Sequence, residues 1–326
     1  MLKNTAKGLF FEPCNMYIDP IQAVDTAIIT HAHADHAHWG IKHYIATAQT
    51  CDFLKERIGK HIKTTALNYH QSITKNSVTI TLIPSGHILG SAHVVLEYKG
   101  YKTVITGDFK IQPDATTTPF QSTPCDLLVM ETTFALPIYH WPKPQKVFKQ
   151  IEQFFNSNKQ NNQHTVLYAY SLGKAQRLIH YLNKSIGPIA VHSAIKKLNQ
   201  IYLNHNHLNT DPPTLTNDLL QKWSTPGLII APPACINSKW IKRLKHYKEA
   251  YISGWMTSKG QIRRRNMAGF VLSDHADWAE LNLAIKQFSP KNVWTMHGYT
   301  TLFAKYLNQQ GINAQPINQT IPQTES

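Results

Sequence analysis

Apolar runs of strand length dominate the first 140 residues of the chain, with few helical patterns between them. The runs are short, and several alternate apolar and polar positions as the two faces of a strand do. The pair Lys99-Gly100 separates two alternating runs and predicts a hairpin turn, because Gly tolerates positive φ. We therefore expect a sheet-rich first part, with strands at 16–18, 27–30, 44–46, 78–83, 93–98, 102–106 and 127–130.

After Pro142 helical and strand-like segments alternate, which is typical of βαβ units and predicts a separate parallel sheet. The polar, Pro- and Asn-rich stretch 204–226 indicates a loop or peripheral insertion. Expected helices lie at 147–155, 172–182, 195–203, 240–247, 278–288 and 301–309, and expected strands at 165–169, 189–191, 228–231, 250–253, 269–273 and 293–296. The predicted organisation is a sheet-rich core whose last pieces return after an inserted α/β unit.

The composition is that of a globular protein. The 326 residues are 42% hydrophobic with 15 Gly and 18 Pro, which excludes disordered and collagen-like chains. The 33 Lys and Arg against 19 Asp and Glu give a net charge of +14, so a polyanion such as nucleic acid is the leading partner. We expect no membrane span and no export, because no apolar run reaches the roughly 18–20 residues of a span and no signal region opens the chain. The four widely spaced cysteines predict reduced thiols in a cytoplasmic protein.

The densest group of chemically active residues is the segment HAHADH at 31–36, directly after a predicted strand. Imidazole nitrogens and carboxylate oxygens are both ligands for ions such as Zn²⁺ or Mn²⁺. In an extended segment His31 and His33 project to the same side, so both can reach one ion, while a turn after Asp35 sends Asp35 and His36 toward a second. The segment therefore predicts a metal site.

Further polar residues stand where other apolar runs stop, and an adjacent Gly often allows close approach of the backbone. Strand ends at one edge of a sheet are where sites are built. These candidate segments are SGHILG at 85–90, TGDF at 106–109, SDHAD at 273–277 and MHG at 296–298.

With Asp19 and ETTF at 131–134, this ordered set resembles the motifs of the metallo-β-lactamase-fold nucleases of the β-CASP group, most closely the bacterial ligase-associated DNA exonucleases. The similarity runs over nearly the whole chain and includes MYIDP at 16–20, LPIYHWP at 136–142, YSLGKAQRL at 170–178 and SGWM at 253–256. The fold that this resemblance implies is an α/β fold, a metallo-β-lactamase αββα sandwich with an inserted α/β β-CASP domain. The implied domains are 1–140 and 267–326 for the core and 141–266 for the insertion, which forms a cap.

The resemblance also implies two divalent metal ions, Zn or Mn, which together hold a hydroxide nucleophile and clamp a phosphodiester. The first ion is held by His31, His33 and His87, the second by Asp35, His36 and His297, and Asp108 bridges them. Asp19 is a carboxylate that orients a ligand. The GHxLG pattern favours His87 over the nearby His93, which we expect in the core or behind the ligands.

Asp35, His275 and Glu131 match the family's catalytic positions. His275 is expected near the leaving oxygen as general acid or charge stabiliser, with Glu131 fixing its tautomer.

Candidate contacts to nucleic acid lie in the expected cap. Lys174 and Arg177 stand at the start of a predicted helix, where backbone N–H groups and a basic side chain can bind phosphate. Arg263, Arg264 and Arg265 form a basic run, and Trp240, Tyr247 and Trp255 are aromatic residues near basic ones that offer possible base-stacking surfaces.

Three functions agree with these observations. The first is a metal-dependent DNA exonuclease of DNA repair that works with an ATP-dependent DNA ligase and a helicase, both implied by resemblance alone. The second is an RNA-processing endo- or exoribonuclease of the same fold, which His297 favours because the RNA-acting relatives carry His there. The third is a nucleic-acid-binding protein that does not cut. The close whole-chain match favours DNA.

Overall fold

The computed structural model describes residues 1–257 and 267–317. The chain divides into two compact units, one built from residues 1–140 and 275–326 and the other from residues 141–274. We refer to them as unit 1 and unit 2.

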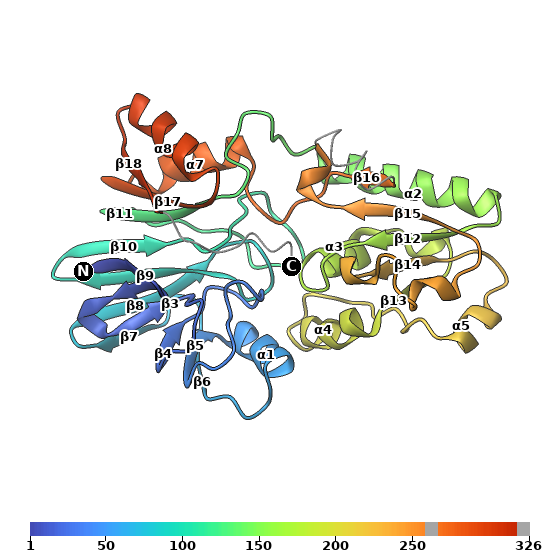
Figure 1. Ribbon diagram of the computed structural model, residues 1–326, viewed down its shortest axis with the longest axis horizontal. Coiled ribbons are helices and arrows are strands. Elements are labelled where there is room, and N and C mark those ends of the chain that lie inside the picture. Colours follow the sequence, from blue (N-terminus) through green and yellow to red (C-terminus); the bar gives the residue numbers. More distant parts are fainter. Residues whose placement is uncertain (258–266, 318–326) are drawn as a thin grey trace. The chain divides into compact units, whose positions relative to one another are not determined.

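Unit 1 contains two sheets (Figure 1). The first has the order β1-β2-β3-β4-β5-β6, antiparallel from β1 to β3 and parallel from β3 to β6. The second has the order β18-β17-β11-β10-β9-β8-β7 and joins an antiparallel part, β7 to β10, to a parallel part, β10 to β18. The strands of the first sheet are β1 Leu2–Thr5, β2 Gly8–Phe11, β3 Met16–Ile18, β4 Thr26–Ile28, β5 His43–Thr47 and β6 Thr64–Leu67. Those of the second are β7 Ser72–Lys75, β8 Val78–Pro84, β9 Ala92–Tyr98, β10 Tyr101–Ile105, β11 Leu127–Thr132, β17 Asn292–Gly298 and β18 Asn313–Pro316.

The two sheets of unit 1 share a core to which both contribute alternate residues, such as Ile18 and Ile45 from the first sheet and Ile80 and Val129 from the second. The opposite face of the second sheet packs against α7 (Trp278–Phe288) and α8 (Thr300–Gln309) through residues such as Leu281. Helix α1 (Ala48–Arg57) lies beside β5 and β6 (Figure 1). The layers of unit 1 are therefore α, β, β and α.

Unit 2 is a parallel sheet with helices between its strands. The strand order is β13-β14-β12-β15-β16, and every pair is parallel. Its elements are α2 Pro144–Gln160, β12 His164–Tyr168, α3 Lys174–Tyr181, β13 Ile189–Val191, α4 Ser193–Asn204, α5 Asn217–Lys222, β14 Leu228–Ala231, β15 Tyr247–Ile252 and β16 Ala268–Phe270. The predicted alternation of helix and strand is confirmed here.

Three expectations differ from the structure. The predicted helix at 240–247 is wrong: a short 3₁₀ turn spans Ile241–Arg243, and Tyr247 already begins β15. Apolar residues three or four positions apart imitate a helical period there, although they enter the core from a turn and a strand. The stretch 204–226, expected as a loop or peripheral insertion, contains helix α5. Strand β16 pairs with β15 in unit 2, whereas the family resemblance implied that residues from 267 onward belong to the core.

The turn predicted at Lys99-Gly100 is present between β9 and β10, with both residues at positive φ (50° and 77°). All four cysteines are buried free thiols. Within residues 1–257 and 267–317, no helix combines the length and apolar character needed to cross a membrane.

Candidate metal centre

The candidate ligands all lie at or just beyond the carboxyl ends of strands of unit 1. His31 and His33 follow β4, His87 follows β8, Asp108 follows β10, and His297 is near the end of β17. Both sheets therefore contribute to one site, and residues that lie up to 266 positions apart in sequence meet there.

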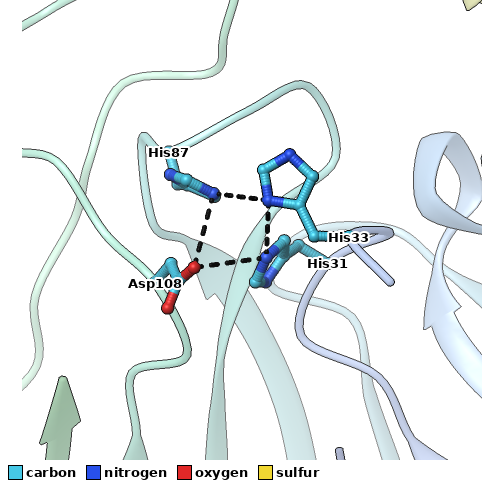
Figure 2. A group of neighbouring side chains, drawn as sticks. All are labelled: His31, His33, His87 and Asp108. Atoms are coloured by element: carbon cyan, nitrogen blue, oxygen red, sulfur yellow. Dashed lines mark hydrogen bonds and ion pairs between the residues drawn. The ribbon is translucent and has the colours of Figure 1, made fainter. Parts of the chain in front are cut away.

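Four side chains converge in what we call the metal-ligand cluster, formed by His31, His33, His87 and Asp108 (Figure 2). The Nδ1 atom of His33 lies 3.1 Å from Nε2 of both His31 and His87. Those two Nε2 atoms lie 3.5 and 3.6 Å from Asp108 Oδ2. Three imidazole nitrogens and a carboxylate oxygen within 4.8 Å of one another are the ligand types that Zn²⁺ and similar ions take, so the donor set fits a divalent cation.

The other oxygen of Asp108 faces a second group of candidate ligands. Oδ1 lies 3.4 Å from His36 Nε2, which in turn lies 3.8 Å from Asp35 Oδ2. The rings of His36 and His297 are 5.4 Å apart, and both residues line a small pocket together with Asp19 and Asp35. The two carboxylate oxygens of Asp108 are thus directed at two different sets of histidines.

Burial and mutual charge shift the pKa values of this region in opposite directions. Burial lowers the pKa of His31 well below its usual value, and the neighbouring His36 adds to this, so the ring is neutral with a lone pair to offer. For His36 burial acts in the same direction, but the carboxylates of Asp108 and Asp35 outweigh it and raise the pKa well above normal. Burial would raise the pKa of Asp108, yet His36, His275 and His31 hold it well below its usual range. Asp108 is therefore a carboxylate.

Asp19 lies behind His36, on the side away from Asp108. Its Oδ2 atom accepts a hydrogen bond from His36 Nδ1 at 2.7 Å, which leaves Nε2 to face Asp108. Thr30 holds this carboxylate through its N–H group (2.8 Å) and its hydroxyl (2.5 Å). Gly107 makes the close packing possible, because a Cβ atom there would lie 2.6 Å from Thr30 Oγ1.

His275 and Glu131 form a pair beside the metal-ligand cluster. His275 Nδ1 lies 2.9 Å from Glu131 Oε2, and its Nε2 lies 3.8 Å from Asp108 Oδ2. Glu131 is itself fixed by the N–H of Phe109 (2.8 Å) and the hydroxyl of Thr133 (2.6 Å). Sequence reasoning missed Thr30 and Thr133, for which the available signal was a hydroxyl residue beside a ligand motif.

His93 belongs to the core. Its Nδ1 atom lies 2.9 Å from the carbonyl oxygen of Thr106, and its ring packs against Phe109, Phe120 and Phe288. Burial lowers the pKa of His93 to about 4, so the ring is neutral at pH 7.

Lys174 and Arg177 differ from the expectation that they bind phosphate at the start of α3. Both are almost fully buried, and both face the buried carboxylate of Asp274, at 3.4 Å (Lys174 Nζ) and 3.6 Å (Arg177 Nη1). Arg177 also donates to the carbonyl oxygen of Ser273 at 2.8 Å. We call these three charged residues the Asp274 cluster. Because their charges are directed at one another inside unit 2, we assign Lys174 and Arg177 an internal role.

The aromatic residues predicted to contact nucleic acid lie in unit 2. Trp240, Tyr247 and Trp255 are partly buried against its core, and the Arg243 guanidinium lies 5.2 Å from the centre of the Trp240 ring. Arg263, Arg264 and Arg265 lie outside the described residues.

The α, β, β and α layers of unit 1 and the candidate ligands at its strand ends are the arrangement expected of a metallo-β-lactamase-type fold with a candidate metal site. No protein-family model matches the chain. Relatives include a protein of Opitutus terrae named "Probable DNA ligase", 31% identical over 317 residues that cover 96% of this chain and 30% of that protein. An "RNase J-like protein" of Methanocaldococcus jannaschii is 23% identical over 90% of this chain and 88% of its own length. "Endoribonuclease YSH1" of Eremothecium gossypii is 28% identical over 120 residues, 36% of this chain and 15% of that protein.

These relatives and the motifs agree in pointing to the β-CASP group of the metallo-β-lactamase fold as the family that this chain resembles. It spans less than a third of the length of the Opitutus protein. The fold also matches a solved structure, a protein of unknown function from Enterococcus faecalis, with a TM-score of 0.60 and 13% identity over 90% of this chain and 79% of that one.

Proposed function

We propose that this protein is a metal-dependent phosphodiesterase that degrades DNA from an end. The observation that carries the proposal is the placement of Asp108, whose Oδ2 faces His31 and His87 while its Oδ1 faces His36. A carboxylate directed at two sets of imidazoles is what two neighbouring cations need as a shared ligand.

Two divalent ions, Zn or Mn, fit these donors. His31, His33 and His87 would hold the first, Asp35, His36 and His297 the second, and Asp108 both. Such a pair supplies positive charge for the phosphate oxygens and an activated water at neutral pH. Asp19 keeps the Nδ1 proton of His36 engaged, so that Nε2 is the ring nitrogen that faces the site.

His275 has the position of a proton donor. Its Nδ1 atom donates to Glu131, which fixes the tautomer, and its Nε2 atom faces the centre near Asp108. In this role His275 protonates or stabilises the leaving oxygen as the phosphodiester bond breaks, and Glu131 orients it. Asp35, about one-third exposed, adds its carboxylate on the side of the site that is open to solvent.

Several features support DNA as the substrate. The net charge of +14 suits a polyanion, and a relative that is similar over 96% of this chain is named a probable DNA ligase. We propose that unit 2 is the β-CASP cap, that its basic residues, Arg263 to Arg265 among them, contact the strand, and that the protein acts in repair with an ATP-dependent ligase and a helicase in the cytoplasm.

RNA processing is the second candidate, and a specific observation favours it. His297 lies beside His36, and relatives named RNase J-like protein and endoribonuclease share the family. The 2′-hydroxyl distinguishes the two substrates.

The test is a time course with the full chain, Mn²⁺ or Zn²⁺, and DNA and RNA strands of one sequence, each labelled separately at the 5′ and 3′ ends. Asp108→Ala, prepared in parallel, controls for contaminating nucleases. A ladder that shortens from one end of the DNA is the expected result, and it gives the polarity. Preferential cleavage of RNA would establish the second candidate, and binding without cleavage under either metal would overturn both.

A further inference from the structure

Trp39 is the most exposed large hydrophobic side chain of residues 1–257 and 267–317, with 73% of its surface accessible. It differs in this from Trp240 and Trp255, which pack against the core of unit 2. The Trp39 ring stacks on that of His38, with centroids 5.8 Å apart and planes 19° apart. Single exposed apolar residues are common, so exposure alone assigns no role. Two further features distinguish Trp39: the hydrogen bonds that fix the main chain around it, and its position close after the HAHADH segment.

The main chain around Trp39 is fixed by hydrogen bonds. The buried Tyr44 donates its hydroxyl to the carbonyl of His38 at 3.0 Å and accepts from the N–H of Ile41 at 3.3 Å. The carbonyl of Trp39 lies 2.7 Å from His38 Nδ1, and Gly40 turns the chain at a φ of 85°. The indole is thus presented to solvent from an ordered loop, which lowers the entropy cost of binding through it.

This loop is continuous with the ligand segment. Trp39 lies three residues after His36, so their Cα atoms are at most about 11 Å apart. Asp35 and Ala34, on the same segment, are exposed or partly exposed, so this side of the centre is open to solvent. A phosphate held at the centre therefore brings neighbouring nucleotides within reach of the indole.

The charge beside the segment suits a polyanion. Arg57, the exposed last residue of α1, donates from Nη1 to the carbonyl of Ala32, between the ligands His31 and His33. A guanidinium beside the ligand segment and an exposed aromatic ring are the two elements by which proteins hold single-stranded nucleic acid.

We propose that Trp39 is a stacking platform for a nucleobase of the substrate strand, about one or two nucleotides from the phosphate at the centre. The inference rests on the proposed function and names a contact of the same site. It predicts that an unpaired base, not only the sugar-phosphate backbone, contributes to binding on this side of the centre.

The test measures binding without cleavage. The full chain in EDTA is titrated into a fluorescein-labelled oligothymidylate of about eight nucleotides and, separately, into a fully abasic strand of the same length, with anisotropy as the readout. Trp39→Ala is compared with Trp39→Phe and with Leu302→Ala, which removes another exposed apolar side chain of unit 1 (55% accessible). Metal content and unfolding midpoints confirm that each variant is folded.

We expect Trp39→Ala to weaken binding of the oligothymidylate about tenfold, with little effect on the abasic strand. Trp39→Phe should stay within about threefold of the wild type and Leu302→Ala should be unchanged. Unaltered binding by Trp39→Ala, or an equal loss on both strands, would overturn the inference even if the protein cleaves DNA. If the wild type binds and discriminates as expected but never cleaves, the inference stands and the proposed function falls. A wild type that binds neither strand overturns both.

Discussion

Unit 1 and unit 2 each bury a cluster of charged or titratable side chains, but the two clusters are balanced in different ways. In the Asp274 cluster two cations face one carboxylate, and Arg177 also donates to a carbonyl. In the metal-ligand cluster His33 Nδ1 lies 3.1 Å from the Nε2 atoms of His31 and His87, and those two Nε2 atoms lie 3.5 and 3.6 Å from the Asp108 carboxylate. His33 Nδ1 faces two ring nitrogens but offers only one proton or one lone pair in the ring plane, so it can make a linear hydrogen bond with only one of them.

Burying polar groups costs free energy unless partners satisfy them. In the Asp274 cluster opposite charges of unit 2 face one another, so we assign it a structural role. The metal-ligand cluster directs lone pairs at a common point, which a cation satisfies. The orientation of the groups thus separates the two roles, whereas burial and residue type do not.

The largest effect is expected at Asp108. Asp108→Ala removes the oxygens that face both ligand sets, so hydrolysis should fall by more than about a thousandfold while circular dichroism shows a retained fold. Metal content, measured by mass spectrometry, should fall as well. Full activity in this variant would contradict the two-metal proposal.

Next is His275, which lies at the edge of the metal-ligand cluster without belonging to its first ligand set. His275→Ala should slow cleavage by about a hundredfold or more, since a proton donor is lost, and leave the metal content unchanged. Loss of an ion from this variant would instead make His275 a ligand, as its approach to Asp108 and Glu131 allows.

Asp274→Ala tests the structural role assigned to the Asp274 cluster. Removing this carboxylate leaves Lys174 and Arg177 buried without its charge, which should cost about 3–5 kcal/mol of the free energy of unfolding, measured by urea denaturation. The folded fraction should keep its full metal content. A variant that loses metal but not stability would reverse the roles assigned to the two clusters.

His93 provides a buried histidine that belongs to neither cluster. Its pKa is about 4 in the folded protein and about 6.5 when unfolded, so its contribution to stability is present above pH 6.5 and lost as the pH falls toward 4. The full loss amounts to about 3 kcal/mol. His93→Asn keeps an N–H donor for Thr106 but does not titrate, so the difference in urea stability between wild type and variant should change between pH 7 and pH 4.5. A constant difference would show that His93 titrates normally.

The smallest effect is expected at Asp19, behind His36. Asp19→Asn keeps the shape and weakens the acceptor for His36 Nδ1, so affinity for one of two ions should fall about 10- to 100-fold while the other is retained. Competition with a chelator measures both affinities. Equal weakening of both ions would show that Asp19 acts on the whole centre.

Local pattern predicted most elements of the chain. The strand at Val78–Pro84 and the helix at Trp278–Phe288 follow from period and capping, since Asp277 and Glu280 form a capping box at the start of that helix. Short strands are stabilised by their neighbours rather than by their own residues, and five of them were missed: Leu2–Thr5, Gly8–Phe11, Thr64–Leu67, Ser72–Lys75 and Asn313–Pro316. Helix α1 was missed as well.

The sequence by itself determined the candidate segments: residue type at strand ends singles out HAHADH at 31–36 and the segments that contain His87, Asp108 and His297, and the family resemblance then implies these residues as ligands. Only the tertiary structure decided what each of these side chains faces. It turned the oxygens of Asp108 toward two different sets of rings, enclosed Lys174 and Arg177 around Asp274, placed His93 in the core and left Trp39 exposed. The physical reason is that a motif specifies which atoms a side chain carries, whereas packing between distant segments specifies what those atoms face.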